Sequence, residues 1–175
     1  MKFNSQVSNW NSLNWGKIDA RVGRIQNRIY TASKAGQIGQ VRFLQNVWIK
    51  RMHAKLIAVG RVTTESKRKT TPGLDEILYE TPSENMQLCR RLRIDGRASP
   101  IRRVCIPKPG KPEKRPLGIA TIKHRAKQKL VWLALEPEWE DKFEANSYGF
   151  RPGRSTKDAV EQILSTLRTK QKVGA

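Results

Sequence analysis

Apolar residues recur at helical spacing through the first third of the chain. Between residues 14 and 31 they stand 4, 3 and 4 positions apart, at Ile18, Val22, Ile25 and Ile29. This spacing places them on one face of a helix. Residues 36 to 57 repeat the pattern with Ile38, Val41, Leu44, Val47, Trp48 and Met52. The stretch SKAG (33–36) separates the two runs, so the pattern predicts two helices joined by a short loop that contains glycine.

The pattern weakens in the middle of the chain. Residues 59 to 73 (VGRVTTESKRKTTPG) lose the periodicity and gain cations, threonine and glycine, which indicates a flexible basic loop. Residues 82 to 93 then predict a short helix, because Ser83 can act as the N-cap ahead of Met86, Leu88 and Leu92.

A β-hairpin follows the polar turn DGRASP (95–100). Ile101, Val104 and Ile106 suggest one strand, and residues 117 to 119 suggest a second. The stretch IPKPGKPEKRPLGI (106–119) would then include the hairpin tip, which is too long for a two-residue turn.

Two more helices complete the pattern. Residues 122 to 136 look helical and are expected to stop before Pro137. The last helix starts at a capping box formed by Ser155 and Asp158, with Ala159, Ile163 and Leu167 along its buried face. The predicted fold class is therefore α+β, mainly helical with one β-hairpin.

Charge is the unusual property of the composition. The 175 residues carry a net charge of +20, and 37% are hydrophobic, enough for a core that would include the five tryptophans. Such a charge attracts polyanions, nucleic acid first and an anionic membrane surface second. A membrane is disfavoured, because no predicted helix combines a basic face with a broad apolar one. The N-terminus (MKFNSQVSNW) lacks the apolar core of a signal peptide, which predicts a cytoplasmic protein. Cys89 and Cys105 are expected to be reduced packing thiols.

The hairpin tip gathers cations on a segment stiffened by proline. Lys108, Lys111, Lys114 and Arg115 stand beside a single acid, Glu113. Lysines at a loop tip can reach a phosphate chain, and the prolines limit the freedom lost on binding. Arg115 begins the returning strand, so its guanidinium is better anchored for phosphate or for stacking on a base. A solvated turn that keeps a sheet edge soluble remains the alternative.

Two further stretches are candidates for binding phosphate. Lys123, Arg125, Lys127 and Lys129 follow the hairpin, and Arg125 and Lys129 are four apart and could act together. The alternative for each is an unspecialised solvated face. In NSYGFRPGRS (146–155), Arg151 and Arg154 precede the Ser155 cap, where a helix N-terminus favours an anion. Tyr148 and Phe150 of this loop are more often core residues than base-stacking platforms.

The sequence predicts no catalytic or metal-binding residue. The acidic run EPEWEDKFE (136–144) reads as a solvated helix end with the loop after it, and His53 and His124 stand alone. No Asp-Asp pair occurs, whereas two-metal catalysis needs carboxylates that converge on one point.

Taken together, these motifs resemble the N-terminal part of a group II intron reverse transcriptase, of the intron-encoded maturase family. RPLGIATIKHRAKQKLVWLALEPEWEDKFEANSYGFRPGRSTKDAV (115–160) is close to the first and second finger blocks of that family. TPGLDEI (71–77) resembles the element before the fingers, and residues 10 to 60 resemble the N-terminal extension. The resemblance implies two parts: residues 1–70, a helical N-terminal extension that contacts RNA and template, and residues 71–175, a fingers subdomain truncated before the catalytic palm.

The resemblance also implies roles for individual residues within a right-hand polymerase fold. Its nucleotide-binding residues would be Lys108, Arg115, Lys111 and Lys114. Its template-binding residues would be Leu117, Ile119, Arg125, Tyr148, Arg151 and Arg154. Trp132, Leu133 and Phe143 are candidates for contacts with the missing palm.

The implied function is that of an RNA-directed DNA polymerase with a maturase role in RNA splicing. The implied partners are intron RNA, template-primer, dNTP and the rest of the parent protein. Mg²⁺ would be needed by the full-length enzyme, and none would be bound by this chain alone, which is expected to be inert for synthesis. A stand-alone RNA-binding module without a polymerase role is the alternative.

Overall fold

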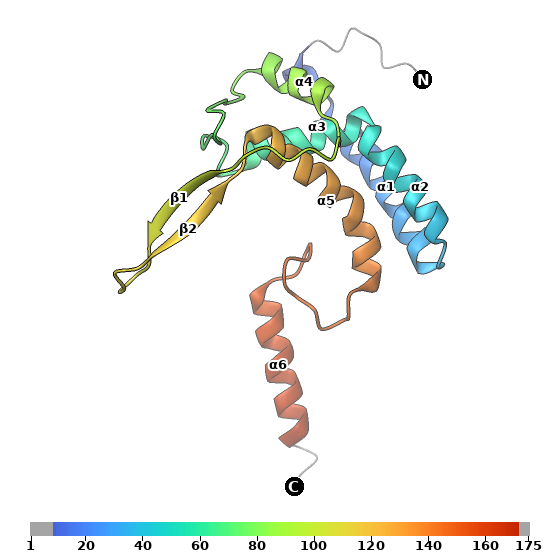
Figure 1. The fold of residues 1–175 in the computed structure, drawn as a ribbon. Coiled ribbons are helices and arrows are strands. Elements are labelled where there is room, and N and C mark those ends of the chain that lie inside the picture. Colours follow the sequence, from blue (N-terminus) through green and yellow to red (C-terminus); the bar gives the residue numbers. More distant parts are fainter. Residues whose placement is uncertain (1–8, 172–175) are drawn as a thin grey trace.

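A computed structural model of the protein describes residues 9–171 (Figure 1). Residues 1–8, on which the expectation about a signal peptide bears, lie outside this range. The longer helices and strands of the protein are α1 (Trp15–Lys34), α2 (Ile38–Lys50), α3 (Met52–Gly60), α4 (Pro82–Arg91), β1 (Arg102–Pro107), β2 (Lys114–Ile119), α5 (Ile122–Lys142) and α6 (Thr156–Gln171). Two short helical turns, η1 (Trp10–Ser12) and η2 (Arg61–Glu65), complete the order. The predicted mainly helical α+β chain with one antiparallel hairpin is confirmed.

The first predicted helix is confirmed, whereas the second is two helices. Ile18, Val22 and Ile29 of α1 are buried, and Gly36 takes a φ of +68° in the turn that follows. The second run breaks at Arg51, whose extended backbone (φ −73°, ψ 133°) ends α2 and starts α3. Six of the nine residues of α3 are buried, so this helix is apolar on nearly every side. The break at Arg51 lets α3 change direction relative to α2, and α3 thereby becomes buried in the middle of the molecule.

The predicted basic loop begins later than expected. The chain stays helical through Gly60 and continues into η2, a π-helical turn, in which Val62 and Thr63 are buried. The hydroxyl of Thr63 donates a hydrogen bond to the Val59 carbonyl at 3.0 Å. Burial of these two side chains therefore holds residues 61–65 in helical form despite their poor periodicity.

The cap of α4 is Thr81 and not Ser83. The Thr81 hydroxyl accepts a hydrogen bond from the Glu84 backbone N–H, and the Glu84 carboxylate accepts one from the Thr81 N–H. These bonds lower the pKa of Glu84. Pro82 occupies the first helical position, where its missing N–H costs no hydrogen bond.

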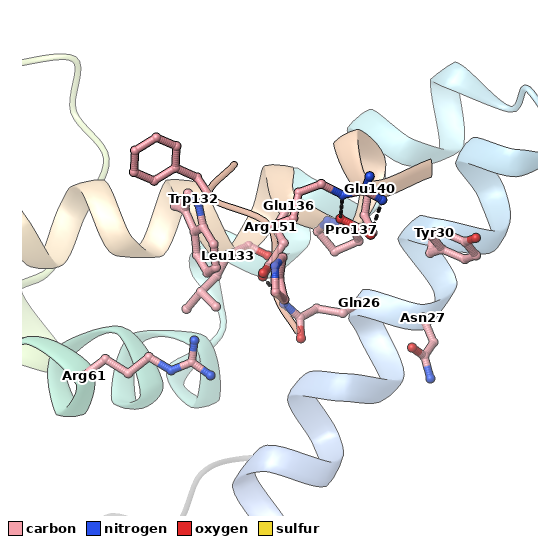
Figure 2. Close-up of a pocket in the computed structure, with 12 residues that line it drawn as sticks. Gln26, Asn27, Tyr30, Arg61, Trp132, Leu133, Glu136, Pro137, Glu140 and Arg151 are labelled. Atoms are coloured by element: carbon pink, nitrogen blue, oxygen red, sulfur yellow. Dashed lines mark hydrogen bonds and ion pairs between the residues drawn. The ribbon is translucent and has the colours of Figure 1, made fainter. Parts of the chain in front are cut away.

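Helix α5 passes through Pro137 and ends at Lys142, so the predicted stop before this proline is wrong. A proline inside a helix leaves the carbonyl four residues earlier without its N–H donor. Here that carbonyl belongs to Leu133, and Gln26 of α1 donates its side-chain Nε2 to it at 3.2 Å (Figure 2). A side chain from another helix thus replaces the lost backbone bond and allows α5 to continue.

One main cluster of buried side chains joins both predicted parts of the chain. It includes Trp10, Trp48 and Leu56 from the N-terminal elements, Leu88 from α4, and Leu130 from α5. A smaller cluster lies between α1 and α2. The expectation of five core tryptophans is only partly confirmed, because Trp132 and Trp139 are 37% and 48% exposed.

Helix α6 has the predicted cap but not the predicted buried face. The Asp158 carboxylate accepts hydrogen bonds from the Ser155 N–H and hydroxyl at 2.6 and 2.7 Å. However, Ile163 and Leu167 are 59% and 57% exposed. Figure 1 shows α6 extending away from the other helices, so nothing in the described part of the chain covers this face.

The two cysteines differ in their surroundings. Cys89 is buried, and burial raises the pKa of its thiol to about 12. Cys105 is exposed on β1, so the prediction of a packing role is wrong for this residue. Across residues 9–171, no helix is both long and apolar enough to cross a bilayer.

We expect Gln26→Leu to lower the free energy of unfolding by about 1–3 kcal/mol, because it leaves the buried Leu133 carbonyl without a donor. Pro137→Ala supplies a backbone N–H at that carbonyl, so the same Gln26 substitution should cost clearly less in a Pro137→Ala background. Urea unfolding of the four proteins of this double-mutant cycle measures the coupling. Additive effects of the two substitutions would contradict the replacement of one bond by the other.

Candidate nucleic-acid interface

The register of the hairpin sorts its side chains onto two faces. β1 and β2 pair from Arg102 opposite Ile119 to Pro107 opposite Lys114. Directly paired residues share a face, and successive residues alternate between faces. One face therefore carries Arg102, Val104, Ile106, Arg115, Leu117 and Ile119. The other carries Arg103, Cys105, Pro107, Lys114, Pro116 and Gly118. Arg115 thus shares a face with the predicted template residues Leu117 and Ile119, while Lys114 lies on the opposite face.

The hairpin tip contains one ion pair of its own. Lys108 Nζ lies 2.7 Å from a Glu113 carboxylate oxygen, and the Lys108 N–H also donates to the Glu113 carbonyl at 3.1 Å. Both side chains are well exposed, so the pair contributes little and can be exchanged for another anion. Lys111, Lys114 and Arg115 are exposed and form no ion pair with any described residue. Within residues 9–171, Lys108 is therefore the only one of the four predicted nucleotide-binding cations that forms an ion pair.

Lys127 holds the segment that leads into the hairpin. Its ammonium lies 2.5 Å from a carboxylate oxygen of Asp95, and its side chain is only 13% exposed. This bond, followed by one from the Arg97 backbone N–H, lowers the pKa of Asp95 to about 2. Lys127 is therefore a structural residue of the hairpin base.

Arg125, predicted to contact the template, faces the chain's own backbone. Its guanidinium donates to the Arg68 carbonyl at 2.9 Å and to the Thr71 carbonyl. Burial, followed by repulsion from Arg68, lowers its pKa. The segment that it holds includes Gly73, where an added Cβ would lie 2.6 Å from the Thr121 backbone. Arg125 thus fixes residues 68–73 against the start of α5, and only its buried Nε has no partner among the described residues.

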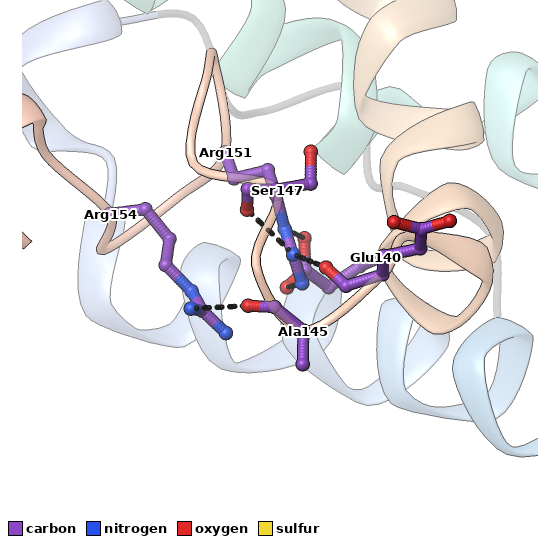
Figure 3. A network of polar contacts seen from close by, with 6 residues as sticks. Glu140, Ala145, Ser147, Arg151 and Arg154 are labelled. Carbon is purple, nitrogen blue, oxygen red and sulfur yellow. Dashed lines mark hydrogen bonds and ion pairs between the residues drawn. The ribbon is translucent and has the colours of Figure 1, made fainter. Parts of the chain in front are cut away.

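Arg151 organises the loop before α6 (Figure 3). Its Nε and Nη2 donate to the Glu140 carboxylate at 3.1 and 2.6 Å, and its Nη1 donates to the carbonyls of Glu144 and Ser147. The bonds from Arg151 lower the pKa of Glu140. Arg151 is 8% exposed, so the guanidinium predicted to face the template is enclosed by its own loop.

The other predicted residues of this loop are more open. Arg154 donates to the Ala145 carbonyl at 3.1 Å and lies 5.3 Å from the ring centre of the half-buried Tyr148. Phe150 is fully exposed and takes a φ of +59°, so it is not a core residue.

The acidic run at the end of α5 contacts the N-terminal helices rather than only solvent. Glu138 accepts a hydrogen bond from Gln45 at 2.7 Å, and Asp141 accepts one from Ser33 at 2.8 Å. In the described part of the chain, no three His, Cys, Asp or Glu side chains gather as a metal site would require.

A row of cations on α1 was not predicted as a site. Lys17, Arg21, Arg24 and Arg28 are exposed and stand 4, 3 and 4 positions apart, which places them on one face along about 16 Å of helix. Arg21 lies 2.8 Å from His53 Nε2, and burial, Arg21 and Arg51 lower the pKa of this histidine. The neutral ring can therefore accept a hydrogen bond and orient Arg21. The sequence alone could have revealed this row, because each of its four cations directly precedes one of the apolar residues Ile18, Val22, Ile25 and Ile29.

The N-terminal helices match a known family, and parts of the chain resemble known proteins. Residues 10–92 match the family described as the N-terminal domain of reverse transcriptase. "Protein YkfC" of Escherichia coli (strain K12) is 37% identical over 118 residues, which cover 64% of this chain and 31% of that protein. "Group II intron-encoded protein LtrA" of Lactococcus lactis subsp. cremoris is 42% identical over 64 residues, or 37% of this chain and 11% of LtrA. An "Uncharacterized 91 kDa protein in cob intron" of Schizosaccharomyces pombe is 36% identical over 114 residues, or 62% and 13% of the two chains.

These matches identify the class of protein. The chain contains the N-terminal region of a reverse transcriptase. The intron-encoded relatives support the predicted likeness to group II intron reverse transcriptases. The aligned part of the chain spans about a third or less of the length of these relatives.

We expect Lys127→Met to raise the pKa of Asp95 from about 2 toward its ordinary value near 3.9. Because the folded state lowers this pKa, the pair stabilises the fold above about pH 4, and that contribution is lost as the pH falls through about 2. An NMR titration of the Asp95 carboxyl carbon measures the change. Lys123→Met, an exposed cation of the same helix, is the control and should leave the Asp95 midpoint unchanged.

Proposed function

We propose that this chain is the RNA-binding N-terminal extension and fingers of an RNA-directed DNA polymerase that also acts as a maturase in intron splicing. The observation that carries the proposal is the placement of two groups of cations that are exposed and, apart from Lys108, form no ion pair among the described residues. They lie on α1 and on the β1–β2 hairpin, at opposite sides of the molecule (Figure 1). One protein can thus hold a long anion on α1 and a second, smaller one at the hairpin.

The cation row on α1 suits the phosphate backbone of RNA. Its side chains project from a rigid helix, and Asp19 is the only acid on that helix. Binding of RNA there releases condensed counterions, a gain that does not depend on base sequence. The template and the intron RNA are the proposed ligands, and the cytoplasm is the proposed location.

The hairpin suits a nucleotide with its phosphates. Arg115 brings an unpaired guanidinium next to Leu117 and Ile119 on one face, so phosphate and base contacts can be made from the same side. Lys111 extends this charge at the tip, and Lys108 can leave Glu113 for a phosphate at little cost. The incoming dNTP is the proposed ligand, with Leu117 and Ile119 against the templating base.

Synthesis itself is assigned to the longer enzyme. The chain has no paired aspartates that could hold two metal ions. We therefore propose a right-hand polymerase in which Mg²⁺ and the catalytic carboxylates belong to a palm beyond residues 1–175, with this chain inert when alone.

The α1 row predicts a specific salt dependence. We expect the double substitution Arg24→Gln and Arg28→Gln to make the slope of log K against log salt for RNA binding shallower by about 1.4. Fluorescence anisotropy of a labelled RNA oligonucleotide at several salt concentrations measures the slope. The control removes Arg90 and Arg91 of α4, which changes the net charge equally but lies outside the row. Equal effects of the two double variants would mean that net charge alone attracts RNA.

Substitution at Arg115 distinguishes the polymerase from a stand-alone RNA-binding module. In the full-length enzyme, Arg115→Ala should reduce nucleotide incorporation by roughly 10- to 100-fold, the value of one charge-assisted phosphate contact, and leave RNA affinity nearly unchanged. Arg103→Ala, on the opposite face of the same hairpin, should change incorporation much less. Loss of RNA affinity without loss of incorporation per bound RNA would favour the module.

A further inference from the structure

We propose that the trough between η2 and α5 binds a nucleotide of single-stranded RNA, with the base stacked on Trp132 and its phosphates against Arg61 and Lys129. The inference rests on the proposed RNA-binding function and adds a site distinct from the hairpin and from the α1 row.

Two neighbouring cavities form this trough. One has a volume of about 690 Å³ and extends toward α1 and the loop at Arg151, and the other, of about 670 Å³, extends toward Arg125. Both are lined by Arg61 and Trp132, so they meet at these two side chains. Each volume is within the range of about 300–1,000 Å³ that is usual for small-ligand sites. Figure 2 shows Arg61 on η2 reaching toward α5, where Trp132 and Leu133 face it.

Trp132 is suited to stack on a base. This residue is 37% exposed although it lies on α5, a helix that packs against α1, α2 and α3. Lys129 Nζ lies 3.3 Å from the indole ring centre, so a cation already covers part of this ring. A base would therefore stack on the face of the indole that Lys129 leaves open, and stacking on an aromatic ring beside a positively charged groove tolerates any base.

The charges around the indole favour a phosphate. Arg61 and Lys129 form no ion pair within residues 9–171. Burial, followed by repulsion from Arg61, lowers the pKa of Lys129, and Glu136 and Glu65 only partly offset this. Arg61 and Lys129 line the same cavity together with Glu65, and neither cation forms an ion pair among the described residues. A phosphate between them would remove this repulsion.

The backbone of η2 positions Arg61 for this role. Residues 61–65 form a π-helical turn, a feature that is frequent at functional sites. Val62 and Thr63 anchor the turn by their burial, while Arg61 is left facing the trough.

Trp139, on the same helix, lacks the two features that mark Trp132, namely a place in a cavity and a close unpaired cation. It is 48% exposed and lines neither cavity. Its nearest cation, Lys142, lies 5.2 Å from the ring centre and is paired with Glu138. Trp139 therefore provides a matched control for Trp132.

The test measures the affinity of the 175-residue chain for a labelled 12-nucleotide oligo(U) RNA by fluorescence anisotropy. We expect Trp132→Ala to weaken binding about 5- to 150-fold, the usual cost of one lost base stack. Trp132→Phe, which keeps an aromatic face, should lose much less, and Trp139→Ala should stay close to wild type. Arg61→Gln should make the salt slope shallower by about 0.7. Circular dichroism of each variant verifies the fold.

The outcomes separate this site from the proposed function. Absence of RNA binding by the wild-type chain would overturn both. Wild-type binding with unchanged affinity of Trp132→Ala would overturn the trough alone, and Trp132 would then be assigned to a contact with protein. Equal losses for Trp132→Ala and Trp139→Ala would also overturn it, because the effect would belong to the whole face of α5.

Discussion

The fold depends on the packing of α5 against the N-terminal helices. Leu130 and Leu133 of α5 are buried with Trp48 and Leu56 in one cluster. Three polar side chains strengthen this contact from the N-terminal side, namely Gln26, Ser33 and Gln45. The hydrogen bond from Gln26 lets α5 continue beyond Pro137, and the additional turns carry Glu138 and Asp141 to their partners. The N-terminal helices and α5 are therefore a single packed unit.

Two groups of cations have different roles. Arg125, Lys127 and Arg151 are bonded to carbonyls or carboxylates of the chain and hold the segments around the hairpin and α6. The cations of α1 and of the hairpin are exposed, and among described residues only Lys108 has an acidic partner there. Arg125 and Lys127 help to position the hairpin cations, because the hairpin leaves the core beside the residues that these two side chains hold. Charge that the fold does not neutralise is thus presented on rigid elements.

Local patterns in the sequence were enough to predict the first helix, the hairpin and the Ser155 cap, since each depends on neighbouring residues. The errors arose where a distant residue decides the outcome. Pro137 stays helical because of Gln26, and residues 61–65 stay helical because two of their side chains are buried. The face of α6 was expected to be buried because its spacing is amphipathic, but spacing does not supply a partner. For the site, residue type was enough to select the hairpin cations as candidates, whereas only the three-dimensional structure could show that Arg125 and Arg151 are bonded to the chain's own carbonyl and carboxylate groups.

Native-state hydrogen exchange of the 175-residue chain tests most directly whether the N-terminal helices and α5 form one unit. We predict that amides of residues 54–59 in α3 and 126–134 in α5 open with the same free energy, equal to the free energy of global unfolding. The hairpin tip at residues 108–113 should exchange much faster. Opening of α5 at a clearly lower free energy than α3 would contradict the account, because the cationic hairpin would then be carried by a separately unfolding element.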